Sequence, residues 1–136
     1  MLTTEAARRI IAAGEARAAA IGVPVNIAVL DAATHLKAFS RMDGAVLGSI
    51  DVAIGKARTA ALFQTTSEAV WDYCKPGASA PGLERSNGGL MTFAGGIPLI
   101  GADGAMIGAV GVSGGAVDQD REIAEAAAAA LASTKE

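Results

Sequence analysis

The sequence predicts an α/β (α+β) fold, in which an antiparallel sheet lies between helices as a three-layer α/β/α sandwich. Three observations support this prediction. Helical and strand patterns follow one another along the chain, tight turns join the paired strands, and the first strand is apolar on both faces. Tight turns are typical of antiparallel pairing, and a strand apolar on both faces indicates helices on both sides of the sheet. No linker or repeat interrupts residues 1–136, so we expect a single domain.

Four segments have the apolar spacing of helices. The first helix is expected at residues 3–21, where Thr3 or Thr4 caps its start and Gly22 ends it. The second helix begins at Ser49, and a short third helix precedes a long loop. A run of alanines, which favour helix, marks the last one. The three later helices are expected at residues 49–64, 67–74 and 117–132.

Strands are expected where aliphatic runs are bounded by turn residues. A turn at residues 31–34 joins the first two strands, and a turn at residues 102–104 joins the last two. The segment 91–94 is a candidate for a further strand. Each pair joined by a tight turn is predicted to be a hairpin. The strands are expected at residues 24–31, 35–41, 97–100 and 106–112.

A loop at residues 75–82, which extends to Gly89 in its longest form, follows the third helix. Loops of about 15 residues in compact domains are usually functional or disordered. Glu84, Arg85 and Asn87 lie in this loop and have polar side chains able to reach a cleft. Glu84 is therefore a candidate ligand-binding residue.

The composition excludes several classes of protein. Hydrophobic residues make up 51% of the chain and charged residues 18%, unlike disordered chains. The single cysteine rules out a disulfide scaffold and, with no signal-peptide pattern, predicts a cytoplasmic protein. The net charge of −3 without a basic stripe predicts no nucleic-acid partner. The longest uncharged stretch, residues 86–102, is shorter than the ~20 residues of a membrane span, so no membrane association is expected.

Three polar residues around the second strand are candidates for chemistry. His35 is the only histidine, and a neutral imidazole binds metal or haem iron or moves a proton near neutral pH. The alternative is a turn residue without a role. Arg41 has a guanidinium fork that matches carboxylates, and Asp43 lies two residues further on. The alternative for this pair is a local ion pair on the surface.

Two further candidates lie on the second helix and after the last strand. Lys56 lies in mid-helix among small residues, where burial lowers a lysine pKa and makes it a base or nucleophile, unless the side chain reaches solvent. Ser113 and Gly114 lead from a strand into a helix N-terminus, where backbone N–H groups bind anions. The alternative for this turn is tight packing.

The motifs, taken in order, resemble one family. They are Asp31 with His35-Leu36, Arg41-Met42-Asp43-Gly44-Ala45, Lys56-Ala57-Arg58-Thr59-Ala60, Gly95-Gly96-Ile97-Pro98, the glycine-rich run 108–115, and Gln119-Asp120. Their order and spacing over residues 2–132 are similar to the haem-binding/GlcG-like family, which includes the C-terminal domain of PduO-type adenosyltransferases. Thr34 stands where a glycine is common in that family.

The resemblance implies a profilin-like fold with a five-stranded antiparallel sheet, and assembly into dimers or larger homo-oligomers. Some relatives bind haem, and one branch degrades it. With one histidine, ligation of haem by two histidines of the same subunit is impossible. Haem here requires His35 alone, a methionine such as Met42, or a ligand from a neighbouring subunit.

Three functions remain open. The first, mainly from the resemblance, is binding of haem or a related tetrapyrrole, with His35 on the iron and Arg41 or Lys56 at the propionates. The second is a cofactor-free enzyme or binder for a small carboxylic acid, of isomerase, tautomerase or decarboxylase type. There Arg41 anchors the carboxylate, Lys56 or Asp43 moves a proton, and the 113–115 turn stabilises negative charge. The third is an assembly module without a ligand.

Overall fold

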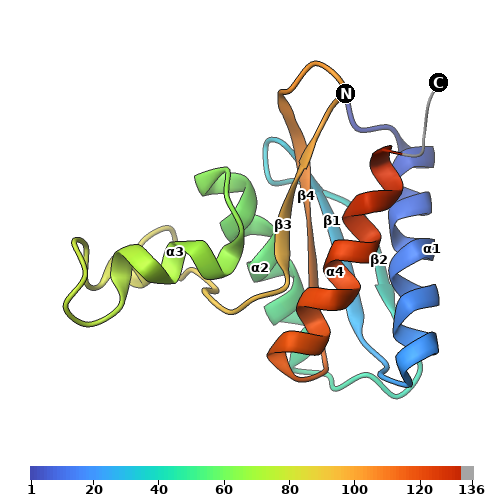
Figure 1. Ribbon diagram of the computed structural model, residues 1–136, viewed down its shortest axis with the longest axis horizontal. Coiled ribbons are helices and arrows are strands. Elements are labelled where there is room, and N and C mark those ends of the chain that lie inside the picture. Colours follow the sequence, from blue (N-terminus) through green and yellow to red (C-terminus); the bar gives the residue numbers. More distant parts are fainter. Residues whose placement is uncertain (133–136) are drawn as a thin grey trace.

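Within the described residues, the fold consists of four α-helices and a four-stranded antiparallel sheet (Figure 1). The computed structural model describes residues 1–132, so residues 133–136 of the predicted domain lie outside the described part. The helices are α1 (Thr4–Ile21), α2 (Ser49–Phe63), α3 (Ser67–Cys74) and α4 (Val117–Ala132), with a 3-10 helix η1 (Leu83–Arg85). The strands are β1 (Asn26–Asp31), β2 (Leu36–Arg41), β3 (Gly96–Ile100) and β4 (Met106–Ser113).

The sheet has the strand order β2-β1-β4-β3, and every neighbouring pair is antiparallel, as predicted. The prediction of a fifth strand was wrong. The described residues form four strands, and residues 91–94 belong to none of them. The backbone of that segment pairs with side chains instead. Met91 donates its N–H to the Thr59 hydroxyl, and the Phe93 carbonyl accepts from the Ser67 hydroxyl. These bonds hold the segment against α2 and α3 rather than in the sheet.

Helices cover both faces of the sheet. In Figure 1, α1 and α4 lie side by side against one face, and α2 lies against the other. Side chains alternate along β1, so Ile27 and Val29 join the larger core under α1 and α4, whereas Leu30 packs with alanines of α2. Gly111 on β4 allows the closest approach of α2, because a Cβ there would lie 2.1 Å from the Ala53 carbonyl oxygen.

The ends of α1 agree with the prediction, whereas the start of α2 differs from it. The Thr3 side chain accepts the Ala6 N–H at the start of α1, and Gly22 ends it with φ at 72°. Gly48 rather than Ser49 is the N-cap of α2, and no side chain caps that end.

The described part of the chain contains no helix that is both long and apolar enough to cross a bilayer.

The segment from α3 to the start of β3 projects from the three layers as an arm (Figure 1). We call residues 67–94 the arm. The predicted long loop lies here, with η1 as its ordered part. Trp71, Tyr73 and Phe93 of the arm are exposed, with Tyr73 at 56%. Most of the few aromatic residues of this chain are therefore on its surface.

Candidate functional site

The structure divides the predicted site residues between the two ends of the sheet. The β1–β2 turn holds His35 at one end, and β2 then runs across the sheet to Arg41 at the other. At about 3.3 Å per residue, the two residues are roughly 20 Å apart along the strand. Ser113 lies at the Arg41 end, because it pairs with Asn26, which itself pairs with Arg41. His35 and Arg41 of one chain therefore belong to separate surfaces.

At the first end, Asp31 organises the turn that presents His35. Its Oδ1 accepts the backbone N–H groups of Ala33 and His35, both at 2.9 Å. The imidazole Nδ1 lies 3.8 Å from Asp31 Oδ2, and the His35 side chain is 81% exposed. Thr34 keeps the left-handed conformation that glycine takes readily, with φ at 69°. The imidazole is therefore accessible on a turn fixed by its own aspartate.

An open groove of about 510 Å³ lies beside this turn. Met1, Leu2, Met106 and Ile107 supply its apolar lining, and Lys37 supplies an ammonium group. Residues 31–33 of the turn complete the wall. The groove therefore combines an apolar surface with a cation, and its lining residues Ala33 and Lys37 lie on either side of His35 in the chain.

At the opposite end, three polar side chains form a row across β2, β1 and β4. The register places Arg41 opposite Asn26, and Asn26 opposite Ser113. Directly paired residues point to the same face of a sheet, with Cβ atoms about 4.5–5.5 Å apart. Arg41 is exposed, and Asp43 is exposed in the following loop. Among the described residues, no ion pair joins Arg41 to Asp43.

Asn26 is fully buried in this row, and its amide is only half satisfied. Its Nδ2 donates to the Val46 carbonyl at 3.2 Å, whereas its Oδ1 has no hydrogen-bond partner within the described chain. Because a carbonyl can only accept, the bond to Val46 fixes which side of the amide is Nδ2. A buried acceptor without a partner costs about 1–3 kcal/mol.

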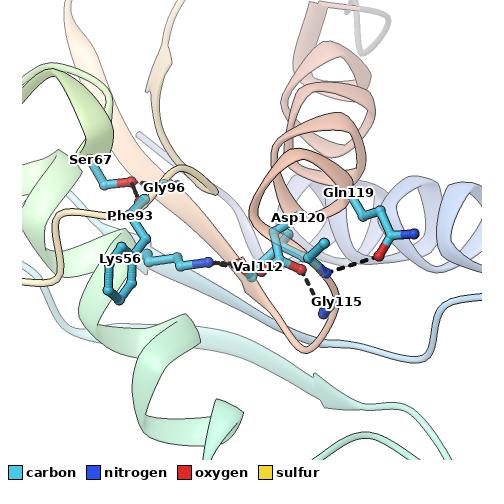
Figure 2. Close-up of polar contacts among 9 residues, drawn as sticks. Lys56, Ser67, Phe93, Gly96, Val112, Gly115, Gln119 and Asp120 are labelled. Carbon is cyan, nitrogen blue, oxygen red and sulfur yellow. Dashed lines mark hydrogen bonds and ion pairs between the residues drawn. The ribbon is translucent and has the colours of Figure 1, made fainter.

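Lys56 forms a buried ion pair with Asp120, which joins α2 to α4 (Figure 2). Its Nζ lies 3.0 Å from Asp120 Oδ2 and 2.9 Å from the Val112 carbonyl oxygen. Both side chains are at most 3% exposed. The lysine passes Gly95, where a Cβ would lie 2.9 Å from Nζ. The ammonium therefore faces the protein interior and not solvent.

Burial moves both members of this pair toward their neutral forms. Desolvation lowers the pKa of Lys56, and the nearby Asp120 opposes that shift. Desolvation raises the pKa of Asp120, against the attraction of Lys56 and hydrogen bonds from the backbone of Gly115 and Gly114. The ion pair is thus held by several mutual contacts that offset a large desolvation cost.

The turn at residues 113–115 already holds an anion of its own. Gly115 donates its N–H to Asp120 Oδ1 at 2.9 Å, and Ala116 donates to Gln119 Oε1 at 2.9 Å (Figure 2). Gly114 also contributes a backbone hydrogen bond to Asp120. The N–H groups of Gly114 and Gly115 therefore stabilise the Asp120 carboxylate of the same chain, whereas Ala116 donates to a neutral amide.

Glu84 lies apart from both ends of the sheet, in η1 of the arm. Its Oε1 is buried and has no hydrogen-bond partner within the described residues. Burial and the neighbouring Glu84 raise the pKa of the Cys74 thiol. Within residues 1–132, no group of three histidine, cysteine or acidic side chains is placed to hold a metal ion.

Sequence reasoning missed the importance of Asn26 and the partner of Lys56. An amide in an otherwise apolar strand was the available signal for Asn26. Asp120 lies near the start of the last helix, where an acidic side chain suits the helix dipole, and only the tertiary fold shows that it meets Lys56.

Comparison with known proteins identifies relatives along nearly the whole chain. The family described as "Haem degrading protein HbpS-like" matches residues 2–129. An uncharacterized 15.0 kDa protein in the dhaT-dhaS intergenic region of Citrobacter freundii is 42% identical over 127 residues, covering 93% of this chain and 89% of that protein. The corrinoid adenosyltransferase PduO of Salmonella typhimurium is 40% identical over 116 residues, covering 85% of this chain but 34% of PduO.

A solved structure supports the same assignment. The crystal structure described as a PduOC:heme complex has a TM-score of 0.89 and 37% sequence identity, and the match covers 96% of this chain and 94% of that one. The family predicted from the sequence motifs is confirmed, including its relation to the C-terminal domain of PduO and to GlcG. The chain belongs to the HbpS-like family of haem-degrading proteins.

Proposed function

We propose that this protein binds haem, or a closely related tetrapyrrole, at the β1–β2 turn. The observation that carries the proposal is the exposed His35 imidazole beside an open groove of about 510 Å³. Two comparisons agree with it. The matched family is described as haem-degrading, and a structure similar over nearly the whole chain is described as a haem complex.

The residues at this turn fit the chemistry of haem. A neutral imidazole is a common axial ligand of haem iron, and His35 is free to approach a ligand from solvent. Met1, Met106 and Ile107 offer an apolar surface to a porphyrin face, whereas Leu2 is only 4% exposed. Lys37 offers an ammonium to a propionate. Bound haem would supply a redox-active iron centre with a position for a second ligand.

Within one chain, Lys37 is better placed than Arg41 or Lys56 to meet propionates. Arg41 lies at the far end of β2, roughly 20 Å of strand away. Lys56 is buried with Asp120. We therefore assign Arg41 no contact with the haem. For Lys56 we propose a structural role in place of proton transfer.

Titration with hemin tests the proposal. We expect a saturable shift of the Soret band for the unaltered protein and at least a tenfold weaker affinity for His35→Ala. Added imidazole should restore the spectrum of His35→Ala. Lys37→Gln should weaken binding by about 1 kcal/mol, which is several-fold, whereas the matched exposed lysine variant Lys75→Gln should not.

Equal hemin affinity in the unaltered protein and His35→Ala would contradict the assignment of the ligand. Absence of any Soret shift would contradict the binding proposal itself. The same samples also test for haem degradation, the activity for which the family is described. In the presence of a reductant and oxygen, haem degradation predicts progressive loss of the Soret band.

We also propose that the chain forms a homo-oligomer through the arm. Trp71, Tyr73 and Phe93 are each at least 40% exposed there, and exposed apolar side chains that gather on one element usually mark interaction sites. Light scattering on the unaltered protein should give a mass above that of one chain. Tyr73→Glu should lower that mass, whereas Leu36→Glu, on an exposed apolar residue of β2, should not. A single-chain mass at micromolar concentration would contradict the proposal.

A further inference from the structure

We infer that the row formed by Arg41, Asn26 and Ser113 is a second binding site, for a small carboxylic acid with a hydroxyl or amino group on the carbon next to the carboxylate. The site lies at the end of the sheet opposite His35. It therefore shares no residue with the proposed haem site. Each of the three side chains contributes a distinct part of the recognition.

Arg41 supplies the group that binds the carboxylate. It is exposed at the edge of the row, and no acidic side chain of the described residues pairs with it. Its guanidinium fork matches a carboxylate in a bidentate geometry. Asp43, two residues further along the chain, is exposed as well. A single arginine favours a ligand with a single carboxylate.

Asn26 supplies an acceptor that the protein leaves empty. The residue is 0% exposed, its Nδ2 is committed to Val46, and its Oδ1 has no partner within the described chain. A simple carboxylate has no proton to donate to this oxygen. A hydroxyl or ammonium group beside the carboxylate does, and it would satisfy Oδ1 while Arg41 holds the acid group.

Ser113 and the start of α2 complete the surroundings. Ser113 is 6% exposed, lies beside Asn26, and has a hydroxyl that donates or accepts. Val46, the residue bonded to Asn26, lies three residues before α2, where the N–H groups of Ser49 and Ile50 donate to the carbonyls of Val46 and Leu47. The positive end of the α2 dipole still favours a carboxylate nearby. Asn26 is fully buried, so entry of the ligand requires residues 42–48, which include the exposed Val46 and Leu47, to move aside.

Three acids of nearly equal size test the inference. Lactate carries a hydroxyl, alanine carries an ammonium group, and propionate carries neither. Isothermal titration and the side-chain amide resonances of Asn26 report binding. We expect lactate or alanine to bind and to shift the Asn26 amide signals, and propionate to bind at least tenfold more weakly. The difference in affinity between lactate and alanine shows whether the site prefers a hydroxyl or an ammonium donor.

Variants at the exposed arginine keep the test independent of folding. Arg41→Gln should weaken binding of the preferred acid at least tenfold, whereas Arg85→Gln, on an exposed arginine of the arm, should not. Arg41→Gln should leave hemin titration unchanged, which separates this site from the proposed haem site. Equal binding of propionate, equal binding by Arg41→Gln, or unshifted Asn26 signals would overturn the inference. The last result would mean that Oδ1 is satisfied by water only.

Discussion

The buried ion pair between Lys56 and Asp120 gives the sharpest prediction about stability. Lys56→Met keeps an unbranched apolar side chain as long as the aliphatic part of lysine and removes the ammonium group. Asp120 would then be a carboxylate at most 3% exposed that has lost its ammonium partner at 3.0 Å. Removing one member of a buried pair typically costs about 3–5 kcal/mol. For a domain of this size, that corresponds to a fall in Tm of roughly 10–15 °C.

A double variant tests the physical reason for that loss. In Lys56→Met with Asp120→Asn, no charge is left buried, and the amide oxygen still accepts the Gly115 N–H. We expect urea unfolding to show recovery of at least about 2 kcal/mol relative to Lys56→Met, because removing both members is far less costly than removing one. A loss below about 1 kcal/mol for the single variant, or no recovery in the double variant, would refute the reasoning.

The loss in Lys56→Met should also depend on pH. Burial already raises the pKa of Asp120, and removal of Lys56 takes away the attraction that opposes this shift. A carboxyl whose folded pKa exceeds its unfolded value destabilises the fold as pH rises between the two values. The deficit against the unaltered protein should therefore narrow as the pH falls from 7 toward 4. A deficit that is constant over this range would contradict the charge argument.

Two further predictions concern the backbone. Gly111→Ala should destabilise the fold by about 3 kcal/mol or more, because the added Cβ would lie 2.1 Å from the Ala53 carbonyl oxygen, and α2 must move. Gly48→Ala is the matched control, since nothing lies within 4 Å of its Cβ position; similar urea midpoints for the two variants would contradict the packing described. Thr34→Gly should raise the free energy of unfolding by about 0.5–1 kcal/mol, because φ at 69° strains a β-branched residue. Thermal unfolding that shows a loss of stability would contradict that reading of the turn.

The fold was predictable in outline because local signals agree with one another. The Thr3 cap, the Gly22 terminator and the turn at residues 31–34 each fix one boundary within a few residues. The prediction of a fifth strand was wrong because backbone groups of residues 91–94 form hydrogen bonds with the side chains of Thr59 and Ser67 instead of with a strand. Nothing local in the sequence reveals a partner that lies about 30 residues away.

The sequence was enough to predict which residues are candidates for a site, but not which of them lie together. The sequence singles out His35, Arg41 and Lys56, but it does not show how far apart they lie in the fold. Strand direction sends the first two to opposite ends of the sheet. Lys56 meets Asp120 only because α2 and α4, from opposite faces, converge at the end of β4. Such pairings depend on tertiary topology, which residue spacing does not encode.

The position of haem on the sheet tests the account most directly. Hemin iron broadens nearby amide resonances, so a titration followed by ¹H–¹⁵N correlation spectra reports where it binds. We predict broadening of residues 31–37 and of Met106 and Ile107, with the signals of Asn26 and Ser113 unchanged. Broadening centred on Asn26 and Ser113, with His35 unaffected, would contradict the assignment of haem to the β1–β2 turn.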